Sequence, residues 1–398
     1  RCSACLRVYS RVGCSDLPTS HFRYVMVVLC MTKGLDCFLF RLDFMFGFAG
    51  RCCLWGLRVC MAGIKDVAAK AGVSISTVSY VMSGKRSIGE ETKKKVLKAA
   101  QELGYQPNLQ ARSLRGEPTR VLALSSPVHE YTDYSNYASF FFALATRARR
   151  YNYDILLLMH EYGDRELTRI AQSGMVDGIL LLDVLMNDAR AEVAKMLDVP
   201  VVSVGYPANS EAVYSVDLDF ERMGREAIEK AAALGHEHVL IIGTSGFAYE
   251  DGSNYLVRFR DAAVKRGADL GVEVVFMTST GSGMADVNLL LDSAFAKYPD
   301  ITAIFDQNNA SHVNNLLFAL HERGLSVPED ISLLCCCSQG LQQLPQTVDE
   351  MPMNPQKVCS RAVDLMMEIL DGRRHDVGAV ELVLGEYHAH GTMVPRKA

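Results

Sequence analysis

Hydroxyl and cationic side chains gather between residues 74 and 94 in a pattern suited to binding phosphate. Ser74 and Thr92 lie near predicted helix starts, and Thr77 and Ser79 follow Ser74 closely, so all four hydroxyls suit phosphate oxygens. For each one, a helix cap or a contact with solvent is the alternative. The side chains that add positive charge to this stretch are Lys85, Arg86, Lys93 and Lys94.

The charge of the chain is divided unevenly along its length. Residues 61–118 carry ten Lys or Arg and five Asp or Glu, a net charge of about +5. Residues 119–398 carry 23 basic and 38 acidic residues, a net charge of about −15. A basic module on an acidic body is typical of a protein that binds nucleic acid. The alternative is a small helical bundle whose lysines serve only solubility.

No residues with catalytic or metal-binding spacing stand out. The sequence contains neither a G-x-S-x-G nucleophile elbow nor a G-x-x-x-x-G-K-[ST] phosphate loop. The pairs His236/His238 and His388/His390 have no further ligands near them in sequence. Cys335–Cys337 end an apolar strand, where reduced thiols are expected and a redox or metal site is the alternative. We therefore predict no catalytic residue, no metal and no cofactor, and a protein that is not an enzyme.

Three short helices are predicted to position the residues between 74 and 94. Gly72 follows the first helix where a tight turn needs a positive φ, and Ser74 is the expected N-cap of the second. Gly104 ends the third helix. This arrangement is a helix-turn-helix, whose second helix presents its N-terminal residues to the major groove of DNA. Val67 and Ala71 share one face of the first helix, and the second carries Val78, Val81 and Met82 on its inner face. The third helix is signalled by Val96, Leu97, Ala100 and Leu103.

From Arg120 onward, apolar strand runs alternate with helical stretches in two series. The first series has strand runs at 121–124, 155–159, 179–182 and 201–204. The rhythm restarts near Asp219, with strand runs at 239–242, 272–277, 302–305 and 331–334. This alternation predicts an α/β fold with doubly wound parallel sheets in two lobes. A ligand would bind in the cleft at the carboxyl ends of the strands.

Two long motifs connect these features to a known family. Residues 66–79 read Asp-Val-Ala-x-x-Ala-Gly-Val-Ser-x-x-Thr-Val-Ser, and residues 95–108 read Lys-Val-x-x-Ala-Ala-x-x-Leu-Gly-Tyr-x-Pro-Asn. Both resemble the lactose-repressor (LacI/GalR) family of bacterial transcription regulators, as do residues 176–179, 234–239 and 324–332. The resemblance runs from Ala62 to the C-terminus. It implies an N-terminal helix-turn-helix DNA-binding domain followed by a two-lobed periplasmic-binding-protein-like core of doubly wound parallel sheets.

The resemblance places the base-reading positions on Ile75, Ser76 and Tyr80. A Ser hydroxyl can donate or accept at a base edge, Ile can contact a thymine methyl group, and Tyr can do either. These three positions complete the expected DNA surface together with the hydroxyl and cationic side chains named above.

The segment after Pro107 matches the hinge helix of the family. In the family this helix folds on specific DNA, and paired hinge helices insert Leu side chains into the minor groove. The matching wedge is Leu114, with Ala111 in the close-packing position and Asn108 at the start. An ordinary linker with an incidental Leu is the alternative.

The resemblance also marks where this chain departs from the family in the ligand cleft. The effector-clamping Arg of the family is Tyr255 here, an Asn-Asp pair is Asn308-Asn309, and an Asp of sugar binders is Gly205. The lost charges favour a ligand held by stacking and neutral hydrogen bonds, with a monosaccharide left open. Packing tyrosines around a vestigial cleft are the alternative. The expected effector contacts are Tyr131, Tyr134, Tyr206, Tyr255, Asn309 and Cys337.

The domain boundaries follow from these assignments. Residues 1–60 contain no Glu and eight of the twelve Cys, and we interpret them as a non-native upstream extension before Met61. Residues 61–107 form the DNA-binding domain, 108–118 the hinge helix and linker, and 119–398 the effector-binding and dimerisation core. Within the core, lobe one is expected at 119–218 and 338–372, and lobe two at 219–337 and 373–398.

The expected function is that of a sequence-specific DNA-binding transcription regulator, in the form of a repressor. Its operator affinity would be controlled by a small molecule bound between the two lobes. Its partners would be double-stranded operator DNA, the effector and a second copy in a homodimer, with a tetramer as the alternative. We expect a cytoplasmic protein without a membrane partner. The alternative function, a periplasmic-type receptor without DNA binding, is disfavoured by the basic helix-turn-helix.

Overall fold

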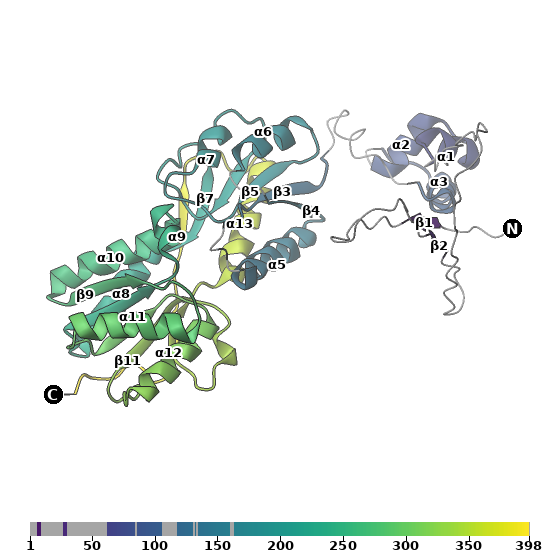
Figure 1. The fold of residues 1–398 in the computed structure, drawn as a ribbon. Helices are drawn as coiled ribbons and strands as arrows, with labels where there is room; N and C mark the ends of the chain where they lie inside the picture. The colour runs from purple at the N-terminus through teal and green to yellow at the C-terminus, as the bar shows by residue number, and fades with distance from the viewer. Residues whose placement is uncertain are drawn as a thin grey trace, which may run out of the picture. The chain divides into compact units, whose positions relative to one another are not determined.

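The computed structural model describes residues 6–8, 27–29, 62–83, 86–105, 118–129, 132, 134–159 and 163–397 (Figure 1). The chain divides into two compact units, residues 1–63 and 64–398. In the first unit, β1 (Leu6–Val8) pairs antiparallel with β2 (Val27–Leu29).

The helix-turn-helix region consists of α1 (Ile64–Ala71), α2 (Ile75–Ser83) and α3 (Glu90–Leu103). Gly72 and Gly104 adopt φ values of 67° and 61°, as predicted for the turn and the helix end. Val67, Val78 and Val96 are fully buried and form the centre of a small core. Leu97, one of the residues that signalled the third helix, is 46% exposed, because Val96, Ala99 and Ala100 occupy the inner face of α3.

Lobe one of the core contains a parallel sheet with the strand order β13-β7-β6-β5-β3-β4 (Figure 1). Its strands are β3 (Val121–Ser125), β4 (Asp154–Leu158), β5 (Gly178–Leu181), β6 (Val201–Val204), β7 (Tyr214–Leu218) and β13 (Val380–Val383). Alternate side chains of the strands point to opposite faces. One face packs on α5 (Tyr134–Arg150) and α13 (Pro355–Leu370), and the other on α6 (Asp164–Gln172) and α7 (Ala189–Ala194).

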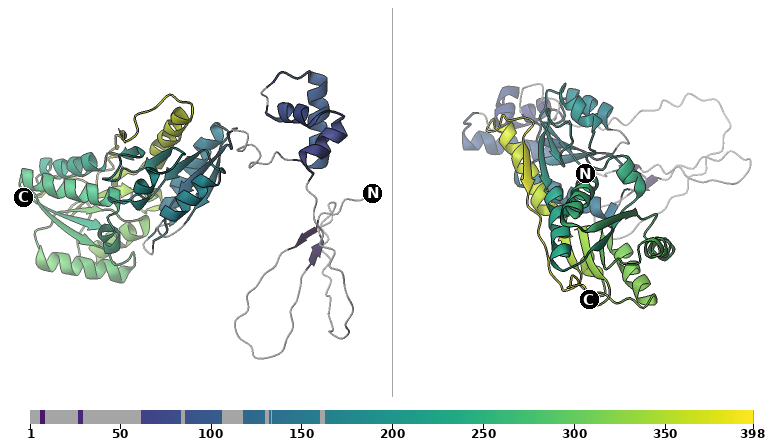
Figure 2. Two further views of the ribbon diagram at one scale, coloured as in Figure 1. Left: turned by 90° about the horizontal axis from the view of Figure 1, so that it is seen from above. Right: turned by 90° about the vertical axis from the view of Figure 1, so that its left-hand side faces the viewer.

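Lobe two contains a second parallel sheet with the strand order β12-β11-β10-β8-β9. Its strands are β8 (His238–Gly243), β9 (Glu273–Thr278), β10 (Ala303–Asp306), β11 (Ser332–Ser338) and β12 (Asp349–Pro352). Figure 2 shows helices on both faces of this sheet. One face packs on α8 (Phe220–Ala233) and α10 (Asn254–Leu270), and the other on α11 (Met284–Lys297) and α12 (Ala310–Glu322). The short elements are α9 (Gly246–Glu250) and η1 (Leu341–Gln343).

Two strands near the C-terminus lie in the opposite lobe from the one expected. β12 pairs with β11 and so belongs to lobe two, whereas residues 338–372 were assigned to lobe one. β13 pairs with β7 and so belongs to lobe one, whereas residues 373–398 were assigned to lobe two. Each strand completes a sheet edge that would otherwise be unpaired. Within residues 163–397 the chain therefore crosses between the lobes three times, after β7, β12 and β13.

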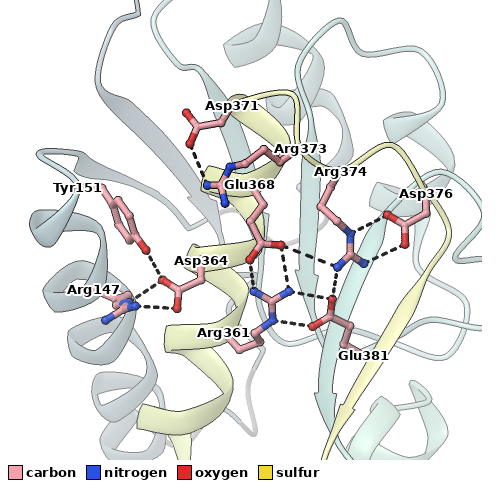
Figure 3. Close-up of polar contacts among 10 residues, drawn as sticks. All are labelled: Arg147, Tyr151, Arg361, Asp364, Glu368, Asp371, Arg373, Arg374, Asp376 and Glu381. Atoms are coloured by element: carbon pink, nitrogen blue, oxygen red, sulfur yellow. Dashed lines mark hydrogen bonds and ion pairs between the residues drawn. The ribbon is translucent and has the colours of Figure 1, made fainter.

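An ion-pair network fastens β13 and α13 within lobe one (Figure 3). The Arg147 guanidinium on α5 donates to both oxygens of Asp364 on α13, each at 2.7 Å. Arg361 on α13 donates to Glu368 at 2.7 Å and to Glu381 on β13 at 2.6 Å. This network connects α13 with β13, the edge strand of the lobe that is last in the sequence. Among the described helices, none is both long and apolar enough to cross a bilayer.

Candidate nucleic-acid interface and ligand cavity

The start of α2 is held by Ser74, as predicted for a helix cap. The Thr77 backbone N–H donates to Ser74 Oγ at 3.1 Å, and the two side-chain hydroxyls lie 2.9 Å apart. The hydroxyl of Ser74 satisfies one of the free N–H groups of the first turn. A capping role therefore occupies these two side chains in the absence of DNA.

The outer face of α2 presents side chains of mixed chemistry to solvent. Ile75 is 45% exposed and Tyr80 is 38% exposed, and Ser76 lies on the same exposed side. The Arg86 guanidinium lies 5.8 Å from the centroid of the Tyr80 ring, within cation–π range. This face offers an aliphatic group, a hydroxyl and a phenol to base edges, with a cation beside them for the backbone.

A cavity of about 460 Å³ lies between the two lobes of the core. It opens at the carboxyl ends of strands from both sheets, where parallel α/β sheets bind ligands. Lobe two contributes mostly neutral polar side chains, which follow β8, β9 and β10. They are Thr244, Ser245, Ser279, Thr280, Ser282, Gln307, Asn308 and Asn309.

Lobe one contributes two carboxyl groups to the cavity wall, Asp183 and Asp217. Burial raises the pKa of Asp183, and His129 Nε2 lies 3.6 Å from its Oδ2. Burial raises the pKa of Asp217 to about 7, against the opposing hydrogen bond from the Leu218 N–H to Oδ1 at 2.8 Å. The cavity wall therefore contains two carboxyl groups, whereas the sequence comparison with the family had led us to expect a wall with few charges.

A buried pair, His312 and Asp306, lies next to the amide residues that lobe two contributes to the cavity wall. His312 Nδ1 lies 2.8 Å from Asp306 Oδ2, and neither side chain is exposed. Burial alone would lower the pKa of His312, but the Asp306 carboxylate outweighs it and the pKa is raised. Asp306 Oδ1 also accepts the Asn308 N–H at 2.7 Å, and Asn309 caps α12 through the His312 N–H. These contacts set the position of two cavity-lining amides.

The two lobes are joined beside the cavity by backbone hydrogen bonds. The Met186 N–H donates to Gly252 O at 2.7 Å, and the Asn254 N–H donates to Val184 O at 3.0 Å. Leu185 and Ser253 form an antiparallel bridge between them. This junction holds the lobes together on one side of the cavity.

Arg258 on α10 strengthens the same junction. Its guanidinium lies 3.4 Å from the centroid of the Tyr206 ring and donates to Tyr206 O at 3.0 Å. Its other terminal nitrogen donates to Glu221 at 2.9 Å. Asn254 Nδ2 donates to the same Tyr206 carbonyl. Tyr206 follows β6 of lobe one, so both contacts from α10 span the two lobes.

Comparisons with known proteins agree with both parts of the chain. A family model described as bacterial regulatory proteins, lacI family, matches residues 63–108, and a periplasmic binding protein-like domain matches residues 228–389. The transcriptional repressor PurR of Vibrio vulnificus is 29% identical over 338 residues, covering 81% of this chain and 96% of its own. The transcriptional regulator RegA of Clostridium saccharobutylicum is 28% identical over 278 residues, covering 68% of this chain and 81% of its own.

The fold agrees with that of a solved repressor. The lac repressor dimer bound to operator and an anti-inducer matches with a TM-score of 0.69 and 19% identity, over 84% of this chain and 99% of its own. The chain carries a DNA-binding domain of the lacI family followed by a periplasmic-binding-protein-like domain. The predicted family, fold class and regulatory function of this lacI-family chain are therefore confirmed.

Most of the expected DNA-contacting residues of this lacI-family protein lie on or next to α2. Ile75, Ser76 and Tyr80 are exposed, and Ser79 and Thr92 are half-buried. Lys85, Asn108, Ala111 and Leu114 lie outside the described residues.

The expected effector contacts are divided by the structure. Tyr255 and Asn309 line the cavity. Tyr134 is 63% exposed at the start of α5, and Tyr206 lies under Arg258, so neither lines it. Cys337 turns its Sγ to Gln307 Nε2 at 3.6 Å and is also absent from the lining. Tyr131 lies outside the described residues.

Most lining residues were missed by sequence reasoning, among them Asp183, Asp217 and Asn254. Asp217 lies in β7, a strand that the sequence analysis did not predict. Its signal was a lone acidic residue in the otherwise apolar or small run from Tyr214 to Leu218, which is buried throughout. A charged side chain inside a buried strand indicates a functional or paired group.

Proposed function

We propose that this chain is a dimeric transcriptional repressor whose affinity for operator DNA changes when a small molecule occupies the cavity between its lobes. The observation that carries the proposal is the exposed face of α2, which presents Ile75, Ser76 and Tyr80 to solvent. This helix lies within residues 63–108, which match the lacI family. Two such modules on a two-fold axis fit an operator of two half-sites.

The proposal assigns a role to each part of the chain. Residues 61–107 read the major groove and 108–118 form the hinge, with Leu114 as the minor-groove wedge. Residues 119–398 bind the effector and the second copy. The effector acts because it binds one arrangement of the lobes more tightly than the other. Such a protein works in the cytoplasm, where its operator is.

An electrophoretic mobility shift assay with the DNA flanking its gene tests the proposal. We expect one sharp complex that survives an excess of random DNA. With 6–10 phosphate contacts, the affinity should fall by roughly 10³–10⁵ between 50 and 200 mM salt. Binding that ignores salt, or equal affinity for random DNA, would contradict the proposal.

A further inference from the structure

Three hydrogen-bond acceptors of the cavity wall point to the kind of ligand that fits it. Within the described part of the chain, Asp217 Oδ2, Asn254 Oδ1 and Asp183 Oδ2 are buried without a hydrogen-bond partner. All three residues line the cavity. Asp217 is 4% exposed and Asn254 is 2% exposed. Buried acceptors without partners are costly, so a ligand that donates hydrogen bonds here would be favoured.

The polar atoms of Asp217 and Asn254 are oriented by contacts on their other side. Asp217 Oδ1 accepts the Leu218 N–H at 2.8 Å, which leaves Oδ2 as the unpaired atom. Asn254 Nδ2 donates to Tyr206 O, which leaves its Oδ1 as the acceptor. Gly205 also lines the cavity, and a Cβ built there would lie 3.1 Å from Val184 Cβ and 3.9 Å from Asn254 Oδ1, so a larger residue would crowd this part of the wall.

The cations around the cavity are already engaged with other groups. Arg190 is 1% exposed and donates to both oxygens of Asp188 and to three backbone carbonyls. Arg258 is held by Glu221 and by the Tyr206 carbonyl. Among the described residues, no Lys or Arg side chain lines the cavity. Asp183 has His129 at 3.6 Å, whereas the guanidinium of Arg258 only partly offsets the effect of burial on the pKa of Asp217.

We infer that the cavity binds a polyol that carries a primary amine, with its ammonium group at Asp217 and Asn254. The inference names the effector class and in that sense rests on the proposed function. An ammonium has three hydrogen-bond donors and one positive charge. It can donate to Asp217 Oδ2 and to Asn254 Oδ1, and its charge balances that of the buried Asp217 carboxylate. The hydroxyl and amide side chains of lobe two match the hydroxyl groups of such a ligand. A neutral sugar would leave the carboxylate uncompensated, and an anion would be repelled by it.

Matched pairs of compounds test the inference on the full chain. The probes are glucosamine and glucose, galactosamine and galactose, mannosamine and mannose, and 1-amino-1-deoxysorbitol and sorbitol. Thermal unfolding at pH 7.5 followed by titration calorimetry should show that an amine member binds roughly 30-fold or more tightly than its neutral partner. Equal or tighter binding by the neutral members, or no stabilisation by any amine, would overturn the inference.

Two variants separate a direct contact from a general effect on charge. In Asp217→Asn the preference for the amine over its neutral partner should disappear. Asp300→Asn, which removes an exposed carboxylate outside the cavity lining, should leave the preference unchanged. If Asp217→Asn fails to fold, Asn254→Ala replaces it, with a loss of amine affinity expected. A preference that survives the Asp217 and Asn254 changes would refute the assignment.

A failure of the ligand inference can be distinguished from a failure of the proposed DNA-binding function. The same preparations are assayed for operator binding without any ligand. If they bind the operator but no amine, the inference fails and the proposed function stands. If an amine binds with the expected preference but no DNA is bound, the ligand class stands and the proposed function fails.

Discussion

At the scale of single residues, Asp217 couples the cavity to the stability of the fold. Burial raises the pKa of its carboxyl from 3.8 to about 7. The folded chain therefore holds this proton more tightly than the unfolded chain does. The resulting stability is fully present below the unfolded pKa and is lost as the pH rises through the folded pKa. Above pH 7 the ligand-free fold carries a buried carboxylate.

We expect Asp217→Asn to be more stable than the native chain at pH 8.5 and not more stable at pH 4. The amide has nearly the same shape and cannot ionise, so it removes the penalty, which corresponds to roughly 4 kcal/mol at most. Thermal unfolding across this pH range, with Asp300→Asn as the control, measures the difference. A gain of the same size at both pH values would show that the effect has nothing to do with ionisation.

Tyr80 and Arg86 should contribute to DNA binding in different ways. Tyr80→Ala should change which bases are preferred, at about 1–3 kcal/mol for a lost base contact. Arg86→Ala should weaken binding to all sequences about equally and reduce the salt slope by about one, as for a phosphate contact. Operator-variant titrations at several salt concentrations measure both. Unchanged base preference in Tyr80→Ala would remove this residue from the reading surface.

At the scale of elements, the network in Figure 3 holds the edge strand of lobe one in place. Arg361 joins Glu368 on α13 to Glu381 on β13, and Arg374 adds a second donor to Glu381 at 2.8 Å. These side chains are between 24% and 29% exposed, so solvent screens them only in part. Removing the shared guanidinium leaves two carboxylates close together.

We therefore expect Arg361→Ala to lower the free energy of unfolding by about 1–2 kcal/mol. Urea denaturation of the chain measures this loss. The matched control is Arg373→Ala, because Arg373 pairs with Asp371 where both side chains are more than 60% exposed. Losses of equal size in the two variants would mean that the network adds nothing beyond the general effect of removing an arginine.

At the scale of the whole core, backbone and side-chain contacts join the two lobes at the junction beside the cavity. Arg258→Ala removes the stacking on Tyr206 and one hydrogen bond between the lobes. We expect faster backbone hydrogen exchange at 184–186 and 252–254, and a larger radius of gyration without ligand. Both follow because fewer contacts hold the two lobes together.

Arg266→Ala serves as the control for this prediction. Arg266 also lies on α10, but it pairs with Glu229 of α8 within lobe two at 2.8 Å. It should leave exchange at the junction and the radius of gyration unchanged. If Arg258→Ala behaves in the same way, the side-chain contacts do not govern lobe closure, and the backbone hydrogen bonds alone hold the junction.

Local patterns in the sequence determined the helix-turn-helix and most strands of the core. Gly72, Ser74 and Gly104 act within a few residues of chain, so a turn, a cap and a helix end could be predicted from residue type. The strand at 201–204 was predicted with its observed bounds, because a buried parallel strand is a continuous apolar run. The two motifs at residues 66–79 and 95–108 then identified the lacI-family resemblance.

Tertiary structure alone decided the lobe of β12 and β13 and the chemistry of the cavity. The edge on which a strand pairs depends on which hydrogen-bonding groups remain free after the sheets assemble, and local sequence does not encode this. Asp217 and Asn254 come from different lobes and are 37 positions apart in the chain. They line one cavity only because the junction at Leu185 and Ser253 brings the two sheets together. Burial in the assembled sheet then raises the pKa of Asp217.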